Sequence, residues 1–140
     1  MISRNPWQSY RQVATKTASP GQLVLMLYEG AISFLEKALV GFQYEDPLEF
    51  NLTINNNLLR AQAIVNELNV TLNMAEGGEI ALHLRRLYTY MDRRLQESNQ
   101  HKEREGIDDV LMRLRVLRDT WAQMLQQGVS KPEIDQKMVA

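Results

Sequence analysis

Apolar residues recur at steps of three and four along most of this chain, and that spacing is typical of amphipathic helices. In the stretch 46–73 they form one stripe along a single helical face. The members of this stripe are Phe50, Ile54, Leu58, Ala61, Val65, Leu68 and Leu72. No segment shows sustained two-residue alternation, so the sequence predicts no β-sheet.

Two further stripes predict helices over 78–99 and 104–127. The first consists of Ile80, Leu84, Leu87, Met91 and Leu95, and the second of Ile107, Leu111, Leu114, Leu117, Trp121 and Leu125. Because both lie on these stripes, Met91 is expected to fill the core and Trp121 to act as a packing residue. These faces must pack against other helices to be buried.

The starts of the first two helices are marked by capping residues. Ser19 stands before a proline, which suits the first helical turn, and Gln22 completes a capping-box pattern. Asp46 also precedes a proline. These signals predict helices over about 19–41 and 46–73. Short connections place sequential helices antiparallel, so we expect an all-α fold: an antiparallel up-down four-helix bundle.

The bulk composition indicates one small intracellular domain. The 140 residues suit a single domain at 1–128, followed by a flexible C-terminal tail at 129–140. The net charge of −1 does not favour a nucleic-acid partner, and no apolar run suggests membrane insertion. The beginning, MISRNPWQSYRQ, lacks the apolar core of a secretory signal, and cysteine is absent. We therefore expect a cytoplasmic protein.

One segment, Leu23 to Tyr28, carries more apolar surface than a bundle helix needs. Its six consecutive apolar or aromatic residues surround the helix at ~100° per residue. The surplus could be buried by ordinary packing, covered by an N-terminal cap segment at 1–18, or occupied by a partner. The apolar residues of that cap segment are Ile2, Trp7, Tyr10 and Val13. Among the methionines, Met26 is the one expected near a binding surface.

The residue patterns of helical-bundle enzymes are missing from the sequence. The two histidines, His83 and His101, have no glutamate three residues before them, as a di-iron site requires. Neither carries a phosphotransfer signature, and no phosphate-binding glycine loop is present. Asp108 and Asp109 sit near an expected helix start, where carboxylates favour the helix dipole. We expect no enzyme activity, no cofactor and no metal.

Three stretches resemble the flagellin export chaperones, the FliS family. The first is Tyr10 followed by TASPGQLVLMLYEGAI, from Thr17 to Ile32. The second is GGEIALHLRRLYTYMDRRLQESN, from Gly77 to Asn99, and the third is LRVLRDTW, from Leu114 to Trp121. They follow the family's order and spacing over nearly the whole chain. The first two blocks together are quite specific.

The resemblance implies an antiparallel helical bundle that binds the C-terminal region of flagellin in the cytoplasm. Such a chaperone prevents premature polymerisation and delivers flagellin to the flagellar type III secretion apparatus. The bound segment becomes partly helical while it wraps around the chaperone, and an N-terminal cap can occupy part of that surface without flagellin. Export-gate or regulatory proteins are additional candidate partners, and a homodimer is compatible with the sequence.

By position, the resemblance points to a groove around the start of the first helix, with Tyr10 as the cap aromatic. The expected flagellin-binding or cap groove comprises Tyr10, Pro20, Leu23, Met26, Leu27 and Tyr28. The chain departs from the family pattern at Glu29, His83 and Thr89, where aspartate, asparagine and aspartate are common. The alternative function is a structural or signalling helix bundle that self-associates through the same apolar surface.

Overall fold

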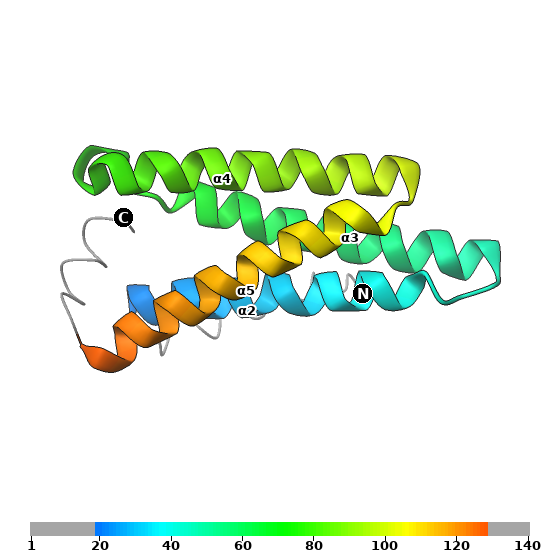
Figure 1. Cartoon of the computed structure of the whole chain (residues 1–140), viewed down its shortest axis with the longest axis horizontal. Helices are drawn as coiled ribbons and strands as arrows, with labels where there is room; N and C mark the ends of the chain where they lie inside the picture. The colour runs from blue at the N-terminus through cyan, green and yellow to red at the C-terminus, as the bar shows by residue number, and fades with distance from the viewer. Residues whose placement is uncertain (1–18, 129–140) are drawn as a thin grey trace, which may run out of the picture.

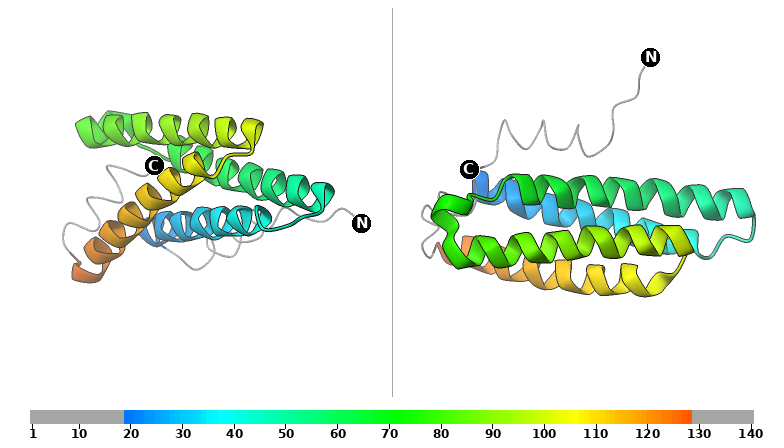
Figure 2. Two further views of the ribbon diagram at one scale, coloured as in Figure 1. Left: turned by 45° about the vertical axis from the view of Figure 1, so that its right-hand side comes forward. Right: turned by 90° about the horizontal axis from the view of Figure 1, so that it is seen from above.

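The computed structural model describes residues 19–128 and is all-helical over that range, which confirms the predicted fold class. The helices are α2 (Pro20–Gly41), α3 (Pro47–Val70), α4 (Met74–His101) and α5 (Arg104–Gln127). Successive helices run antiparallel; α2 and α4 each pack against both α3 and α5 (Figure 1, Figure 2). No β-strand occurs in residues 19–128. The expected N-terminal cap and C-terminal tail lie outside the described residues.

The predicted caps fix where the first two helices begin. The Ser19 hydroxyl accepts a hydrogen bond from the Gln22 backbone N–H at 3.2 Å, and the Gln22 side chain accepts one from the Ser19 N–H at 3.2 Å. The Asp46 carboxylate accepts the Glu49 N–H at 3.0 Å. These bonds satisfy N–H groups that a helix start leaves without partners. Both helices therefore start where local sequence places them.

The connection between α3 and α4 differs from the expected one. α3 ends at Val70, three residues before the expected end at 73, because the next residues form a turn that leads into α4. Asn73 caps α4 by accepting the Glu76 N–H at 3.2 Å. A break follows at Gly78, which has φ 58° and ψ −135°. Glycine adopts such a positive φ without a steric penalty, so the long straight part of α4 starts after it.

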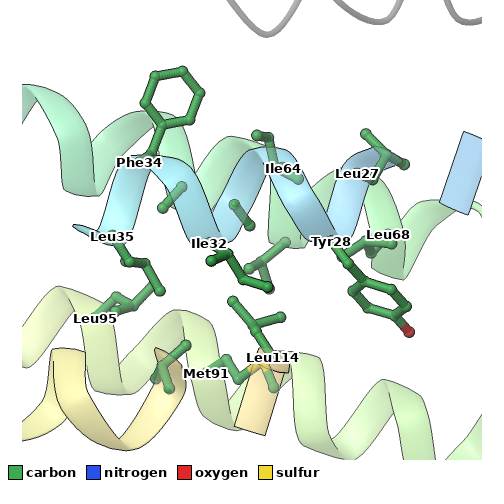
Figure 3. Packing of buried hydrophobic residues seen from close by; sticks show 14 of the residues in the cluster. Leu27, Tyr28, Ile32, Phe34, Leu35, Ile64, Leu68, Met91, Leu95 and Leu114 are labelled. Carbon is green, nitrogen blue, oxygen red and sulfur yellow. The ribbon is translucent and has the colours of Figure 1, made fainter. Parts of the chain in front are cut away.

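The core consists of the apolar stripes of all four helices (Figure 3). Met91 is 0% and Trp121 4% exposed, which confirms their expected places in the core. The prediction was wrong for Ile80, which is 61% exposed. This residue lies directly after the break at Gly78, where α5 has already diverged from α4 (Figure 1). α5 is therefore not available to cover it.

A ladder of polar side chains joins α3 to α4 and sets their register. The three pairs are Asn55–Asn99, Gln62–Asp92 and Asn69–Arg85, with hydrogen bonds of 2.9, 3.1 and 3.1 Å. The partners are seven residues apart on each helix and run in opposite directions, as two antiparallel helices require. A shift of one helical turn would break all three pairs. The ladder therefore specifies one alignment of α3 against α4.

α5 leaves α4 soon after the connection between them and leans toward α2 (Figure 1, Figure 2). The connection is tight. Lys102 adopts φ 54°, and its ammonium group donates a hydrogen bond to the Asn99 carbonyl oxygen at 2.7 Å. At the far end of α5, the Trp121 indole N–H donates to the Gly21 carbonyl at 2.7 Å. α5 thus crosses from one neighbour to the other along its length.

Close packing at the start of α5 depends on Gly106. A Cβ atom at this position would lie 2.1 Å from the Ser98 hydroxyl and 3.0 Å from the Arg94 carbonyl oxygen. Both Gly106 and Ser98 are buried. The absence of a side chain therefore permits α5 to start directly against the end of α4.

We predict that Gly106→Ala lowers the free energy of unfolding by about 1–3 kcal/mol, because the added methyl group overpacks this contact. Urea unfolding monitored by circular dichroism measures the change. Ser98→Ala removes the closest atom, so the double variant should recover part of the loss while Ser98→Ala alone stays near the parent. Equal stability of Gly106→Ala and parent would show that the two helices separate at no cost.

Candidate functional site

The predicted groove residues fall into two groups in the structure. Leu27 and Tyr28 are 2% and 1% exposed, and their side chains lie in the core (Figure 3). Leu23 and Met26 are half-buried, and Pro20 is exposed. Part of the six-residue apolar run is therefore buried by ordinary packing. The sixth predicted residue, Tyr10, lies outside the described residues.

The half-buried residues share one flank of α2. Leu23, Met26 and Gly30 follow one another at steps of three and four, so they line up along the helix. The same flank continues to Phe34, whose ring lies 5.9 Å from the guanidinium carbon of Arg60 on α3. We name Leu23, Met26 and Gly30 the α2 strip. Leu23 and Met26 are the half-buried members of the apolar run on this flank.

Buried aromatic side chains hold the start of α2 in place. The hydroxyl groups of Tyr28 and Tyr88 are hydrogen-bonded at 2.5 Å, which joins α2 to α4. The Tyr28 ring packs edge-on against Trp121 of α5, with ring centroids 6.4 Å apart. The indole of Trp121 in turn binds the carbonyl of Gly21. We call Tyr28, Tyr88 and Trp121 the aromatic joint.

Burial of the joint changes the acidity of its phenols. Desolvation raises the pKa of Tyr28 to about 12, although its hydrogen bond with Tyr88 offsets part of the rise. The pKa of Tyr88 is also raised well above its ordinary value, first by burial and then by the neighbouring Tyr28. Both phenols therefore stay neutral in the folded protein at physiological pH.

A small opening lies beside the aromatic joint. Residues from all four helices line it, including Val24 of α2, Leu72 beyond the end of α3 and Leu84 of α4. Its lining is almost entirely apolar, apart from Thr71 and the tyrosine hydroxyls. It is only about large enough for one water molecule, so it cannot hold a side chain of a partner.

A wider hollow lies on the surface between α4 and α5. Its lining residues are His83, Arg86, Leu87, Tyr90 and Arg113. The set combines apolar surface with positive charge, and none of these five residues carries a carboxylate. We call this site the α4–α5 hollow.

One carboxylate behind the hollow organises its polar side chains. Asp109 accepts a hydrogen bond from the Tyr90 hydroxyl at 2.5 Å and another from Arg113 Nε at 2.9 Å. Arg94 contacts the same carboxylate at 3.4 Å. The hydrogen bond from Tyr90, aided by Arg113 and Arg94, holds the pKa of Asp109 below its ordinary value. The guanidinium carbon of Arg113 also lies 5.0 Å from the centre of the Tyr90 ring.

Sequence reasoning missed this cluster. It interpreted Asp109 as a helix-start carboxylate, whereas the structure joins it to Tyr90, nineteen residues earlier on another helix. The available signal was the i, i+4 spacing of Asp109 and Arg113, which favours an ion pair on one helix face. No local pattern could have added Tyr90.

We also searched residues 19–128 for metal-binding clusters and membrane-spanning helices. Across residues 19–128, no group of three or more histidine, cysteine or acidic side chains is placed to hold a metal ion. The two histidines are exposed and far apart in sequence. None of the helices of residues 19–128 is long and apolar enough to cross a bilayer.

The fold and these surfaces define a class: a small helical bundle whose candidate sites are binding surfaces on its helices. Comparison with models of protein families identifies the family. Residues 3–128 match the model of the family described as flagellar protein FliS. Because the match covers most of the chain, this protein belongs to the FliS family. The resemblance read from the sequence is confirmed.

Curated relatives support the same assignment. The chain is 36% identical over 126 residues to the flagellar secretion chaperone FliS of Bacillus subtilis, covering 90% of each chain. It is 33% identical over 128 residues to the protein of that name from Salmonella typhimurium, covering 89% of this chain and 93% of the relative. The protein of the same name from Escherichia coli is 30% identical over 129 residues.

The aromatic joint predicts an alkaline loss of stability. Unfolded tyrosine loses its proton near pH 10, whereas folded Tyr28 keeps it until about pH 12, so the unfolded state is favoured as pH rises above 10. The free energy of unfolding should fall by about 1.4 kcal/mol per pH unit between these values because of Tyr28, and the raised pKa of Tyr88 acts in the same direction. Urea unfolding from about pH 8, where both states keep their phenol protons, to about pH 11, where only the unfolded state has lost them, measures the slope.

The matched control is the double variant Tyr28→Phe/Tyr88→Phe. It removes both hydroxyls together, so no buried hydroxyl loses its partner. All other titrating groups are common to the two proteins, and the difference in slope belongs to the joint. Parallel pH profiles for parent and control would contradict the assignment.

Proposed function

We propose that this protein is a cytoplasmic export chaperone that binds the C-terminal region of flagellin. It keeps flagellin from polymerising before export and delivers it to the flagellar type III secretion apparatus. Membership of the FliS family and the printed names of the relatives, flagellar secretion chaperones, support this role. The observation that carries it is the α2 strip, where Leu23 and Met26 remain half-exposed beside a full core. The protein acts by binding without turnover.

The free-energy balance explains what such a site must supply. A client segment that is disordered when free loses conformational entropy as it orders on the chaperone. Burial of apolar surface contributes roughly 25 cal/mol per Å², so an extended interface can exceed this cost and stay reversible. Leu23 and Met26 offer such surface, and an unbranched methionine adapts to varied client side chains.

The proposed groove assigns different tasks to the residues singled out in the sequence. Pro20, Leu23 and Met26 contact the client, or the cap residue Tyr10 when no client is bound. Leu27 and Tyr28 act from inside, because both are buried and fix the orientation of α2. Competition between cap and client for the α2 strip would keep apolar surface covered in both states.

The first prediction concerns the client itself. Calorimetric titration of the full chain with a flagellin C-terminal segment should give saturable one-to-one binding. The flagellin N-terminal segment, tested at the same concentrations, should give none. Absence of binding by the C-terminal segment would overturn the proposed function.

Sedimentation of the protein alone separates this function from self-association. That second candidate is favoured by one observation: α3 carries exposed apolar residues on a single outer face. They are Leu48, Leu52, Leu59 and Val70, with exposures from 48% to 74%. A concentration-dependent increase in mass without client, together with no client binding, would favour the self-associating bundle. A constant mass would leave the chaperone function as the better account.

Leu23→Asp should weaken binding of the C-terminal segment by about tenfold or more, because a carboxylate in a buried apolar contact loses its hydration. The chain should stay folded, since Leu23 is only half-buried. Calorimetry measures the affinity and thermal unfolding checks the fold. Leu27→Asp is unsuitable, because a charge at a 2% exposed core position would unfold the bundle.

Leu25→Asp provides the matched control. Leu25 is also half-buried on α2, but two residues further along it points to a different side of the helix. It should cost similar stability and leave client affinity close to that of the parent. A folded Leu23→Asp variant with parental affinity would place the client elsewhere.

A further inference from the structure

The α4–α5 hollow carries more positive charge than the groups around it neutralise. Arg86 and Arg113 line it, and none of its lining residues has a carboxylate. The carboxylate behind the hollow, that of Asp109, is shared between Arg113 and Arg94. One carboxylate offsets only one of these two guanidinium charges. The hollow therefore stays positive on a chain whose overall net charge is −1.

Both lining arginines have N–H groups free for a further carboxylate. Arg113 donates to Asp109 through Nε, and its two terminal amino groups make no hydrogen bond within residues 19–128. The Tyr90 ring, 5.0 Å from its guanidinium carbon, and Asp109 hold this guanidinium in place, so little side-chain entropy is left to lose on binding. Arg86 is exposed and makes no hydrogen bond or ion pair in the described range. The hollow thus offers two fork-like donors to carboxylates.

The segment 129–140, which lies outside the described residues, contains carboxylates at a matching spacing. Glu133 and Asp135 are two positions apart in the sequence. In an extended segment, side chains at this spacing point to the same side and are about 7 Å apart. Each carboxylate can then face one of the two arginines, Arg86 and Arg113, at the same time.

The chain beyond Gly128 is long enough to reach the hollow. Gly128 ends α5 with φ 66°, a left-handed conformation that turns the chain away from the helix axis. Arg113 lies fifteen residues earlier, about 22 Å back along the helix at ~1.5 Å per residue. Glu133 and Asp135 follow Gly128 by five and seven residues, which an extended chain spans in about 17 and about 23 Å. The long arginine side chain covers the remaining gap.

Charge selects this segment over the other end of the chain that lies outside the described residues. Residues 1–18 contain the cations Arg4, Arg11 and Lys16 and no acidic residue, so a positive hollow repels them. In the segment 129–140, the two lysines stand outside the acidic pair, one on each side. The match to the FliS family ends at residue 128, so this segment belongs to the chain beyond the family match.

We propose that the segment 129–140 binds back into the α4–α5 hollow of its own chain, with Glu133 and Asp135 on Arg86 and Arg113. The short link to Gly128 gives the segment a high effective concentration at the hollow. It covers a positive surface that otherwise attracts acidic segments of other proteins. An acidic partner must displace it before reaching the hollow. The proposal does not rest on the proposed function, because its occupant is part of this chain.

The absence of cysteine from the sequence permits a site-specific test. A spin label on Ile134→Cys broadens the NMR signals of nearby amides in the full chain. In an extended segment, this position points away from both carboxylates, so the label does not displace them. We expect broadening at His83 and Leu87 of α4, and it should fall about threefold or more as salt is raised from about 50 mM to about 500 mM. Absence of broadening at these amides at low salt would overturn the proposal.

Two double variants test the paired charges. Arg86→Gln/Arg113→Gln should lower the broadening on α4 about threefold or more, because charge-assisted hydrogen bonds are lost. Glu133→Gln/Asp135→Asn should do the same, and combining both changes should add little, because the two halves of one interaction are non-additive. The second variant leaves all four helices unchanged, so it keeps the test valid if loss of Arg113 weakens the fold. Parental broadening in this second variant contradicts the proposed contact.

Arg115→Gln is the matched control on the bundle. Arg115 lies on the same helix two residues from Arg113 but pairs with Glu36 of α2 at 2.9 Å, away from the hollow. This exposed pair contributes little to stability. The control should retain the parental broadening and its salt dependence. An equal loss in the control would assign the effect to total charge and overturn the specific contact.

A mixing experiment identifies which chain supplies the segment. Isotope-labelled protein without the spin label is mixed with unlabelled protein that carries it at position 134. No broadening of His83 and Leu87 is expected in the mixture, because each hollow is occupied by its own chain. Broadening as strong as in the singly labelled chain would assign the segment to a second copy and overturn the intramolecular contact.

Discussion

The buried face of α2 sets the orientation of that helix in the bundle, and the hydrogen bond between the hydroxyls of Tyr28 and Tyr88 is a polar contact on this face. It connects α2 to α4, two helices that otherwise share few contacts because α3 and α5 lie between them. α5 cannot make this connection, since it leans away from the beginning of α4 and toward α2 (Figure 1). Together with buried apolar residues of α2 such as Leu27 and Leu35, this bond sets the rotation of α2 about its axis. With Tyr28 turned inward, Leu23 and Met26 must face the flank.

That constraint explains what the sequence could and could not predict. Caps such as Ser19 and Asp46 bind residues three positions away, and apolar stripes such as that of α3 repeat within a few turns. Both can therefore be predicted from residues that are close in sequence. A run of six apolar residues carries no such information, because every rotation of the helix buries some of them. The choice among rotations is made by residues far away in the chain, among them Tyr88, sixty residues after Tyr28. The contact between Tyr90 and Asp109 could not be predicted for the same reason, because the two residues are nineteen positions apart and lie on different helices.

The physical character of the α2 strip has consequences for specificity. Apolar contact on the α2 strip is non-directional and accepts many sequences that bury a similar area. Directional contacts such as charge-assisted hydrogen bonds discriminate between ligands more strongly. An apolar strip by itself would therefore not distinguish one disordered apolar segment from another.

Release is the remaining requirement for an export chaperone, and the shallow burial of these sites bears on it. A half-exposed Leu23 or Met26 can lose only part of its surface on binding, so each contact contributes a small share of roughly 25 cal/mol per Å². Affinity then depends on the number of contacts engaged along the surface, and no single pocket dominates. A client pulled from one end would break such contacts in succession, each with a small barrier. A deep pocket of equal total affinity would have to be emptied in one step, and the dissociation rate would be correspondingly lower.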